Sequence, residues 1–442
     1  MSVKFSPMQR IKTFLNSLSR WLTPGLGVKR WFVLVLFGTT VISLGVADVL
    51  LDFYRESTSA FWTDFVYYVS LLFLPPIVRA LIFGGIGFGS IIYGVLKLNQ
   101  AILRPFVKPG KPVIDIVENF RRQSRGPRVV VIGGGHGLST LLRGMKDFTR
   151  NLTAIVTVAD DGGSSGRLRD TMGILPPGDI RNCLAALSND EDLIAQLFQY
   201  RFVNGGGDLE GHSFGNLFIS ALTNLTGSFE KAVAESGKVL SVHGKVLPAT
   251  LHDVRLLADK ALPYVDGEVT INGESKIPQI KGQVRRIWLE PKNPPAYPEA
   301  IQKILNADLI AIGPGSLYTS IIPNLLVPDI AKALKSSKAL KVFICNLITQ
   351  PGETEGYSCK DHVNALDEHT GLRLFDMVIV NNSGEVGNGD LEWVKADEDL
   401  ENFYSVYRCD VADTEKPGYH HAGKLSKILI DLLMERTGPL VF

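Results

Sequence analysis

The chain has 442 residues and a formal net charge of +1, but its charges are unevenly distributed. Residues 1–126 carry 15 Lys and Arg against 6 Asp and Glu, whereas residues 127–442 carry 31 against 39. The larger part is therefore mildly acidic and has no basic stripe, which argues against nucleic acid as a partner. Its four cysteines are far apart and form no C-x-x-C pair, so nothing indicates a disulfide framework or a zinc site, and buried, reduced cysteines are expected.

The basic leader, residues 1–98, is predicted to be a membrane region with two transmembrane helices, at about 31–51 and 77–98. The first stretch has the roughly twenty apolar residues needed to cross hydrocarbon, and the second contains glycines that allow close packing. Lys and Arg flank the outer ends and acidic residues lie in the connection, so both ends are expected to face the cytoplasm. The protein should then reside in the inner or plasma membrane. A buried hairpin and a signal peptide are the alternatives, and the missing cleavage site disfavours the latter.

A basic linker with several prolines, residues 99–127, leads to a globular part at 128–442 in which strands and helices alternate. The predicted strands are apolar, β-branched runs typical of a parallel sheet buried on both faces: Val129–Ile132, Thr153–Ala159, Leu309–Ile312, Leu340–Cys345 and Met377–Val380. Between about 239 and 290 the pattern changes to short strands with Gly-containing turns (Val239–Val242, Glu268–Ile271 and Arg286–Leu289), which predicts an antiparallel insertion. The fold class is therefore α/β: a Rossmann-like, doubly wound, mostly parallel sheet with a small antiparallel insertion.

Glycine-rich loops follow three of these strands, where ligands bind in doubly wound sheets. The first loop comprises Gly133, Gly134, Gly135, His136 and Gly137. It lacks the third glycine of a dinucleotide fingerprint and the Lys of a P-loop, so we expect backbone N–H groups, not a standard motif, to contact a phosphate. His136 either donates to that phosphate or caps the loop. Another such loop, after the strand Leu309–Ile312, contains Gly313, Gly315 and Ser316. An ordinary glycine turn is the alternative.

Asp160 and Asp161 end the second strand. Such a pair can bind a ribose hydroxyl, hold Mg²⁺, act as a general base or cap a turn. The residues that follow supply small backbone, hydroxyl and guanidinium groups suited to phosphate, with solvated surface arginines as the alternative: Gly162, Gly163, Ser164, Ser165, Arg167 and Arg169. Four further residues are expected at the same cleft, although Asp179 is also placed to cap the next helix: Asp179, Arg181, Asn182 and Asn216. Gln350 to Thr354 form a candidate lid, and Tyr419 to His421 a cap of the last helix.

Together these segments resemble the YvcK-type branch of the 2-phospho-L-lactate transferase (CofD-like) family, often called gluconeogenesis factors. The matching blocks are IGGGHGLS (132–139), VADDGGSSGRLR (158–169), PPGDIRNCL (176–184), GHSFGNL (211–217), VLPAT (246–250), IGPGSLYTSIIPNLLV (312–327) and NLITQPGETEGYS (346–358). They extend from about 128 to 425 and leave out the leader. His136 departs from the threonine common in the family, so contacts of that side chain are not carried over.

The resemblance implies a Rossmann-like core that binds a nucleotide or a UDP-sugar, with roles in cell shape and in growth on gluconeogenic carbon sources. It also implies an alternative: a Mg²⁺-dependent transferase of phospholactyl groups, whose acceptor site lies near Asp160 and Asp161. We therefore expect a membrane-tethered nucleotide-sugar binder, with the transferase as the second hypothesis and a dehydrogenase as a weaker third. The sequence leaves a homo-oligomer open.

Overall fold

The computed structural model forms two compact units, 1–121 and 122–442, and each is described by itself. It describes residues 60–69, 71–103, 123–188, 193–203, 207–264, 266–382 and 391–437, together with five residues between 37 and 47. Most of the expected first span, 31–51, and most of the expected linker lie outside the described residues.

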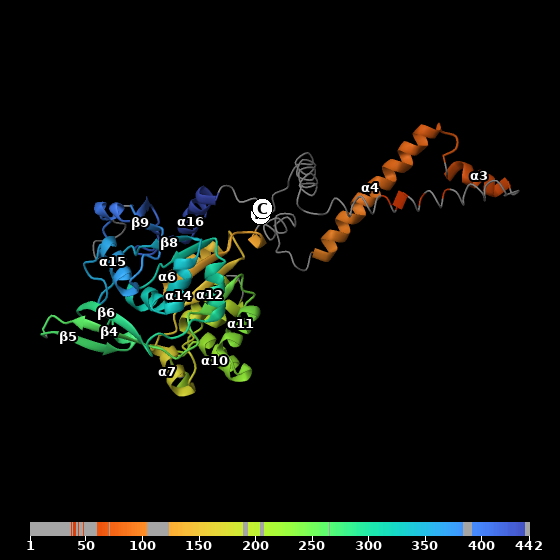
Figure 1. Ribbon diagram of the computed structural model, residues 1–442. Coiled ribbons are helices and arrows are strands. Elements are labelled where there is room, and N and C mark those ends of the chain that lie inside the picture. Colours follow the sequence, from red (N-terminus) through yellow and green to blue (C-terminus); the bar gives the residue numbers. More distant parts are fainter. Residues whose placement is uncertain are drawn as a thin grey trace. The chain divides into compact units, whose positions relative to one another are not determined.

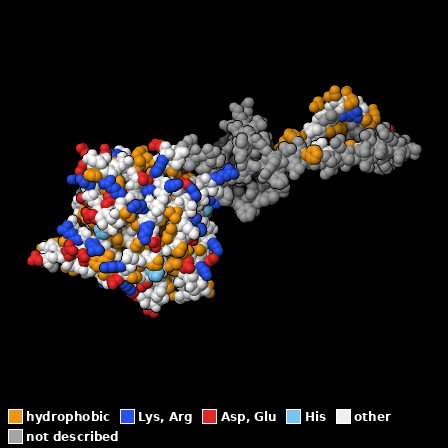
Figure 2. Space-filling view, viewed as in Figure 1, with side chains coloured by type: hydrophobic (Ala, Val, Ile, Leu, Met, Phe, Trp, Pro, Cys, Tyr) orange, Lys and Arg blue, Asp and Glu red, His pale blue; other side chains and the backbone are white. Residues whose placement is uncertain are grey.

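The first unit contains α3 (Ala60–Val69) and the longer α4 (Pro76–Leu103), which includes the expected second span. Residues 76–93 of α4 have a mean hydropathy of 1.6. Among the described residues, this is the single helical stretch that is long and apolar enough to cross a membrane. Large apolar side chains along it are exposed, among them Ile77, Leu81 and Tyr93 (Figure 2).

The second unit is built on a seven-stranded sheet in which every neighbouring pair is parallel. Its strands are β1 (Val129–Gly133), β2 (Leu152–Val156), β3 (Lys245–Pro248), β7 (Leu309–Ile312), β8 (Leu340–Ile344), β9 (Met377–Asn381) and β10 (Ser405–Cys409). The order is β10-β9-β8-β7-β1-β2-β3, so its direction reverses between β1 and β7. This is the doubly wound arrangement expected from the sequence, and it places the ligand-binding edge at the β1 and β7 ends.

Helices pack against this sheet (Figure 1). They are α6 (Gly135–Met145), α7 (Gly163–Met172), α8 (Gly178–Leu187), α9 (Leu193–Gln199), α10 (Phe214–Thr226), α11 (Phe229–Val239), α12 (Pro298–Leu305), α13 (Ile322–Leu325), α14 (Pro328–Ser336), α15 (Cys359–Thr370) and α16 (Ala422–Thr437). Ser213, Ser228 and Ser358 cap α10, α11 and α15, because each side chain accepts a backbone N–H of the first turn. Val129 to Ile132 of β1 are at most 2% exposed, as expected for a strand covered on both faces.

A separate three-stranded antiparallel sheet has the order β5-β4-β6 and extends away from the parallel sheet (Figure 1). Its strands are β4 (Arg255–Ala261), β5 (Glu268–Asn272) and β6 (Gln283–Glu290). The insertion is thus present, but the strand expected at 239–242 is wrong. Val239 ends α11, the next strand along the chain, β3, pairs in parallel with β2, and the antiparallel sheet begins only at β4. The apolar residues from Val239 to Val242 lie at the end of α11 and in the turn after it. A short apolar run does not distinguish a strand from the end of a buried helix.

Candidate ligand-binding cleft

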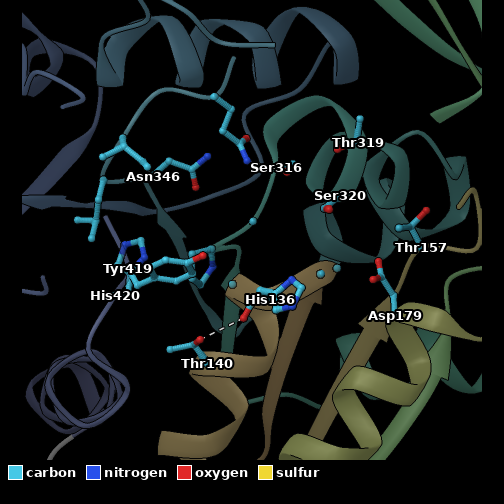
Figure 3. Close-up of a pocket in the computed structure, with 18 of the residues that line it drawn as sticks. His136, Thr140, Thr157, Asp179, Ser316, Thr319, Ser320, Asn346, Tyr419 and His420 are labelled. Atoms are coloured by element: carbon cyan, nitrogen blue, oxygen red, sulfur yellow. Dashed lines mark hydrogen bonds between the residues drawn. The ribbon is translucent and has the colours of Figure 1, made fainter. Parts of the chain in front are cut away.

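A cavity of about 450 Å³ opens at the carboxyl ends of β1 and β7, where the strand order reverses (Figure 3). Segments that follow β2 and β8 complete it, so four neighbouring strands deliver their ends to one place. The expected residues that line the cavity are Gly134, Gly135, His136, Gly137, Asp160, Asp179, Gly315 and Ser316. Two of the three expected glycine loops therefore share one cavity.

The backbone geometry of the β1 loop explains two of its glycines. A Cβ atom on Gly137 would lie 2.6 Å from the carbonyl oxygen of Pro314, which is backbone and cannot yield. Gly135 has φ +64°, a left-handed conformation that favours glycine. The loop thereby brings the first turn of α6, with its backbone N–H groups and positive dipole end, to the cavity wall.

The sequence suggested that Asp179 caps its own helix, α8, but the structure shows that it does not. The N-cap of α8 is Pro177, and the carboxylate of Asp179 instead accepts the backbone N–H of Gly135 in the first turn of α6. Burial, together with the nearby charge of Asp160, raises the pKa of Asp179 to about 7. Asp179 therefore links the starts of two helices and lies beside Thr157 in the cavity (Figure 3).

Further carboxyl groups make this side of the cavity acidic. Asp160 accepts the N–H of Gly162 at 2.8 Å, and burial raises its pKa. Glu274, from the insertion, also lines the cavity. Burial and the charges of Asp160 and Asp179 raise the pKa of Glu274 to about 9. Behind the wall, Glu353 is 5% exposed and bonds to Thr319 at 3.2 Å. Burial raises its pKa to about 7.

Asp161 does not line the cavity, unlike its neighbour Asp160. Its Oδ1 accepts the backbone N–H of Ser275 at 2.9 Å, and its Oδ2 lies beside Gly273. Both partners belong to the insertion and flank Glu274. Asp161 therefore acts in this structure as a cap for an insertion turn, which is the turn-capping alternative in a non-local form.

The segment from Gly162 to Arg169, expected as a loop, forms the N-cap and first turns of α7 and does not line the cavity. Ser164 Oγ lies 2.9 Å from His212 Nδ1 and accepts a hydrogen bond from Asn216 Nδ2 at 3.1 Å. Arg167 donates to the carbonyl of Glu210. Arg169 is 4% exposed, pairs with Asp253 and donates to the carbonyl of Val254. These side chains tie α7 to α10 and to the start of β4.

Five more of the expected residues, Gly133, Ser165, Arg181, Asn182 and Gly313, do not line the cavity. Ser165 contacts Asp160 and packs against the start of α8. Arg181 donates to Asn182 at 2.7 Å, and burial lowers its pKa to about 10, so it stays charged and faces Asp179 and Asp160. Gly133 is the last residue of β1, and Gly313 directly precedes Pro314. Neither lines the cavity.

Further residues line the cavity that the sequence did not indicate as ligand contacts, although Gln350 was expected in a lid and Tyr419 and His420 in a helix cap. They are Thr140, Thr157, Glu274, Pro314, Thr319, Ser320, Asn346, Leu347, Ile348, Gln350, Gly418, Tyr419 and His420. Tyr419 and His420 lie on the side of His136 opposite Asp179 (Figure 3). Only His421, whose Nδ1 accepts the N–H of Lys424, caps α16. Gln350, expected in a lid, donates to Ser316 at 2.8 Å and belongs to the wall.

No lysine or arginine lines this cavity within the part of the chain that the structure describes. Phosphate contact therefore depends on the N–H groups of the first α6 turn and on hydroxyl groups such as that of Ser316. Among the described residues, no three His, Cys, Asp or Glu side chains form a group that could hold a metal ion. The residues present fit a Mg²⁺ ion held by one or two carboxylates, with phosphate oxygens and water as its other ligands.

The fold and the cleft define an α/β protein with a cavity at the switch point of a doubly wound sheet. The model of the family described as 2-phospho-L-lactate transferase CofD matches residues 129–422. A putative gluconeogenesis factor from Nostoc sp. is 46% identical over 94% of this chain and 92% of its own length. The gluconeogenesis factor of Bacillus subtilis is 48% identical over 70% of this chain and 99% of its own.

A crystal structure from Bacillus halodurans is similar with a TM-score of 0.63 and 44% identity, covering 69% of this chain and 99% of that one. The chain therefore belongs to the CofD family, within its gluconeogenesis-factor branch.

Proposed function

We propose that this protein binds a UDP-sugar in the β1/β7 cleft and couples its level to carbon metabolism and cell-envelope synthesis, with an effect on cell shape. The observation that carries the proposal is the cavity itself. The N-terminus of α6 enters it next to the acidic side chains Asp160 and Glu274. Helix N–H groups favour a diphosphate, and carboxyl groups favour hydroxyls, so one cavity offers both chemistries of a nucleotide sugar.

Titration calorimetry of the full-length chain in detergent with UDP-N-acetylglucosamine tests this proposal. We expect saturable binding that is competed by UDP. No heat beyond dilution at millimolar ligand contradicts the proposal. ADP-glucose serves as the control ligand for the base.

A second function, Mg²⁺-dependent transfer of a phospho-group, is favoured by one observation. Asp160 reaches the cavity from the strand adjacent to the phosphate-binding loop, and positioning together with a metal ion is most of what phosphoryl-group chemistry needs. When bound, Mg²⁺ would neutralise phosphate charge there. Product formation from a nucleotide-linked donor and a deazaflavin acceptor, abolished by Asp160→Asn, supports the transferase. Binding without turnover supports the regulatory role.

We also propose that the leader tethers the protein to the inner or plasma membrane, with the globular unit in the cytoplasm. Exposed apolar side chains along α4 support this, because in water such a helix would leave a large apolar surface uncovered. Carbonate extraction of cell membranes tests it: the full chain should stay in the pellet. Release into the supernatant contradicts the tether.

A further inference from the structure

The insertion contributes one side chain, Glu274, to the ligand cavity. This residue lies in a short 3-10 turn, η3 (Glu274–Lys276), between β5 and β6. The turn is far along the chain from the glycine loops, and it belongs to the antiparallel sheet and not to the Rossmann-like core. Glu274 is therefore a cavity residue that the insertion adds to the core.

Two side chains hold this turn in place. Asp161, from the loop after β2, accepts the N–H of Ser275 at 2.9 Å. Lys260 of β4 is fully buried, and its ammonium group donates to the carbonyls of Ile277 and Gly352 at 2.9 and 2.7 Å. The turn is thus fixed to the β2 loop at its start and to the segment carrying Glu353 at its end. Because both ends of the turn are held by hydrogen bonds, the backbone that carries Glu274 has a defined position.

The surroundings of Glu274 decide which part of a ligand can lie against it. Asp160 and Asp179 line the same cavity as Glu274, and the carboxylate of Asp161 is bonded to the backbone of the next residue, Ser275. A phosphate placed there would meet like charges at short range, which is costly in a half-buried site. Uncharged hydroxyl groups, which both donate and accept hydrogen bonds, meet no such penalty. The phosphates belong at the α6 N-terminus, and the hydroxyl-bearing part belongs at Glu274.

We propose that Glu274 hydrogen-bonds the sugar hydroxyls of the bound nucleotide sugar, and that Asp161 is a positioning residue that holds Glu274 there. This inference rests on the proposed function and adds to it the part of the ligand that the insertion recognises. It predicts discrimination between a nucleotide sugar and the same nucleotide without its sugar. Asp161 acts only through Glu274.

The test compares affinities of the full-length chain in detergent for UDP-N-acetylglucosamine and for UDP. Glu274→Ala should weaken binding of the nucleotide sugar about 10-fold, the usual effect of losing a hydrogen bond in a partly buried site, and leave binding of UDP within about twofold. Glu268→Ala, on an exposed position of β5, is the matched control and should change neither affinity. Equal weakening for both ligands, or for neither, overturns the assignment of Glu274.

Asp161→Ala should weaken binding of the nucleotide sugar but not of UDP. In the double variant with Glu274→Ala, the affinity for the nucleotide sugar should fall no further than in Glu274→Ala alone. Additive losses would overturn the positioning role. Asp161→Asn keeps an acceptor for the N–H of Ser275 and should restore most of the affinity. Hydrogen exchange of residues 273–277 gives a readout that needs no ligand: it should rise in Asp161→Ala, and an unchanged rate contradicts the hold on the turn. If the unaltered chain binds neither ligand, the proposed function fails, and the role of Glu274 fails with it.

Discussion

Replacing Lys260 by methionine is expected to destabilise the globular unit and to loosen the cleft wall. Lys260 is fully buried, and its ammonium group donates to the carbonyls of Ile277, Ile280 and Gly352. Methionine fills a similar volume but donates nothing, so the buried carbonyls of Ile277 and Gly352 and the more exposed carbonyl of Ile280 lose their partner. Burial itself lowers the pKa of Lys260, so the substitution also removes an unfavourably desolvated charge.

The size of the effect follows from these opposing contributions. Each unsatisfied buried carbonyl costs about 1–3 kcal/mol, and relief of the ammonium desolvation offsets part of the sum. A net loss of roughly 3 kcal/mol in the free energy of unfolding is therefore expected. Because Gly352 precedes Glu353 and follows the cavity residue Gln350, the variant should also bind the nucleotide sugar more weakly.

Urea unfolding followed by circular dichroism measures the free energy, and calorimetry measures the affinity. The control is Lys281→Met, the same substitution at an exposed position of the same insertion, which should stay within about 0.5 kcal/mol. A loss below about 1 kcal/mol for Lys260→Met would mean that water satisfies the three carbonyls, and would refute the reasoning.

Three further predictions follow from the cleft and the leader. Gly137→Ala should lose about 1–3 kcal/mol of unfolding free energy and most ligand affinity, because its Cβ meets the Pro314 carbonyl. In the control Gly133→Ala the nearest atom is 3.8 Å away. Urea unfolding and calorimetry check both. Carboxyl pKa values raised by burial mean that the folded chain binds more protons than the unfolded one, so thermal stability without ligand should fall between about pH 5 and 8. Glu274→Gln should flatten that fall, and a melting temperature that rises across this window contradicts it. A fragment 123–442 should leave the membrane fraction yet bind the nucleotide sugar within about twofold of the full chain.

The sequence predicts the parallel strands at the centre of the sheet because each is a continuous apolar run, as in Val129 to Ile132. It misses β3 and β10, the two edges, where Lys245 and Ser405 begin short strands with polar members. An edge strand needs less apolar surface, so its pattern is weak. The glycine loops after β1 and β7 were placed correctly because strand ends alone determine their location.

The missed cavity residues come from segments whose local sequence gives no signal. Glu274 reaches the cavity because Asp161, in the segment after β2, holds the neighbouring Ser275, and Tyr419 because the next residue, His420, contacts the Cys345 carbonyl at the end of β8. Both depend on contacts between distant parts of the chain, which a motif search cannot supply. An acidic residue in a turn and a tyrosine before a helix are ordinary in solvent-exposed positions.

The polar segment from Asp161 to Arg169, at the start of α7, supports the cavity without lining it. Asp161 holds the turn that carries Glu274, Arg169 pairs with Asp253 at the entrance to β4, and Ser164 joins α7 to α10. The segment therefore connects the core, the insertion and the helical layer around one cavity. Substitutions at Arg169 should therefore lower the free energy of unfolding and the ligand affinity together, because Arg169 holds the residues that lead into the insertion. A residue that contacts phosphate would instead change affinity without changing the free energy of unfolding.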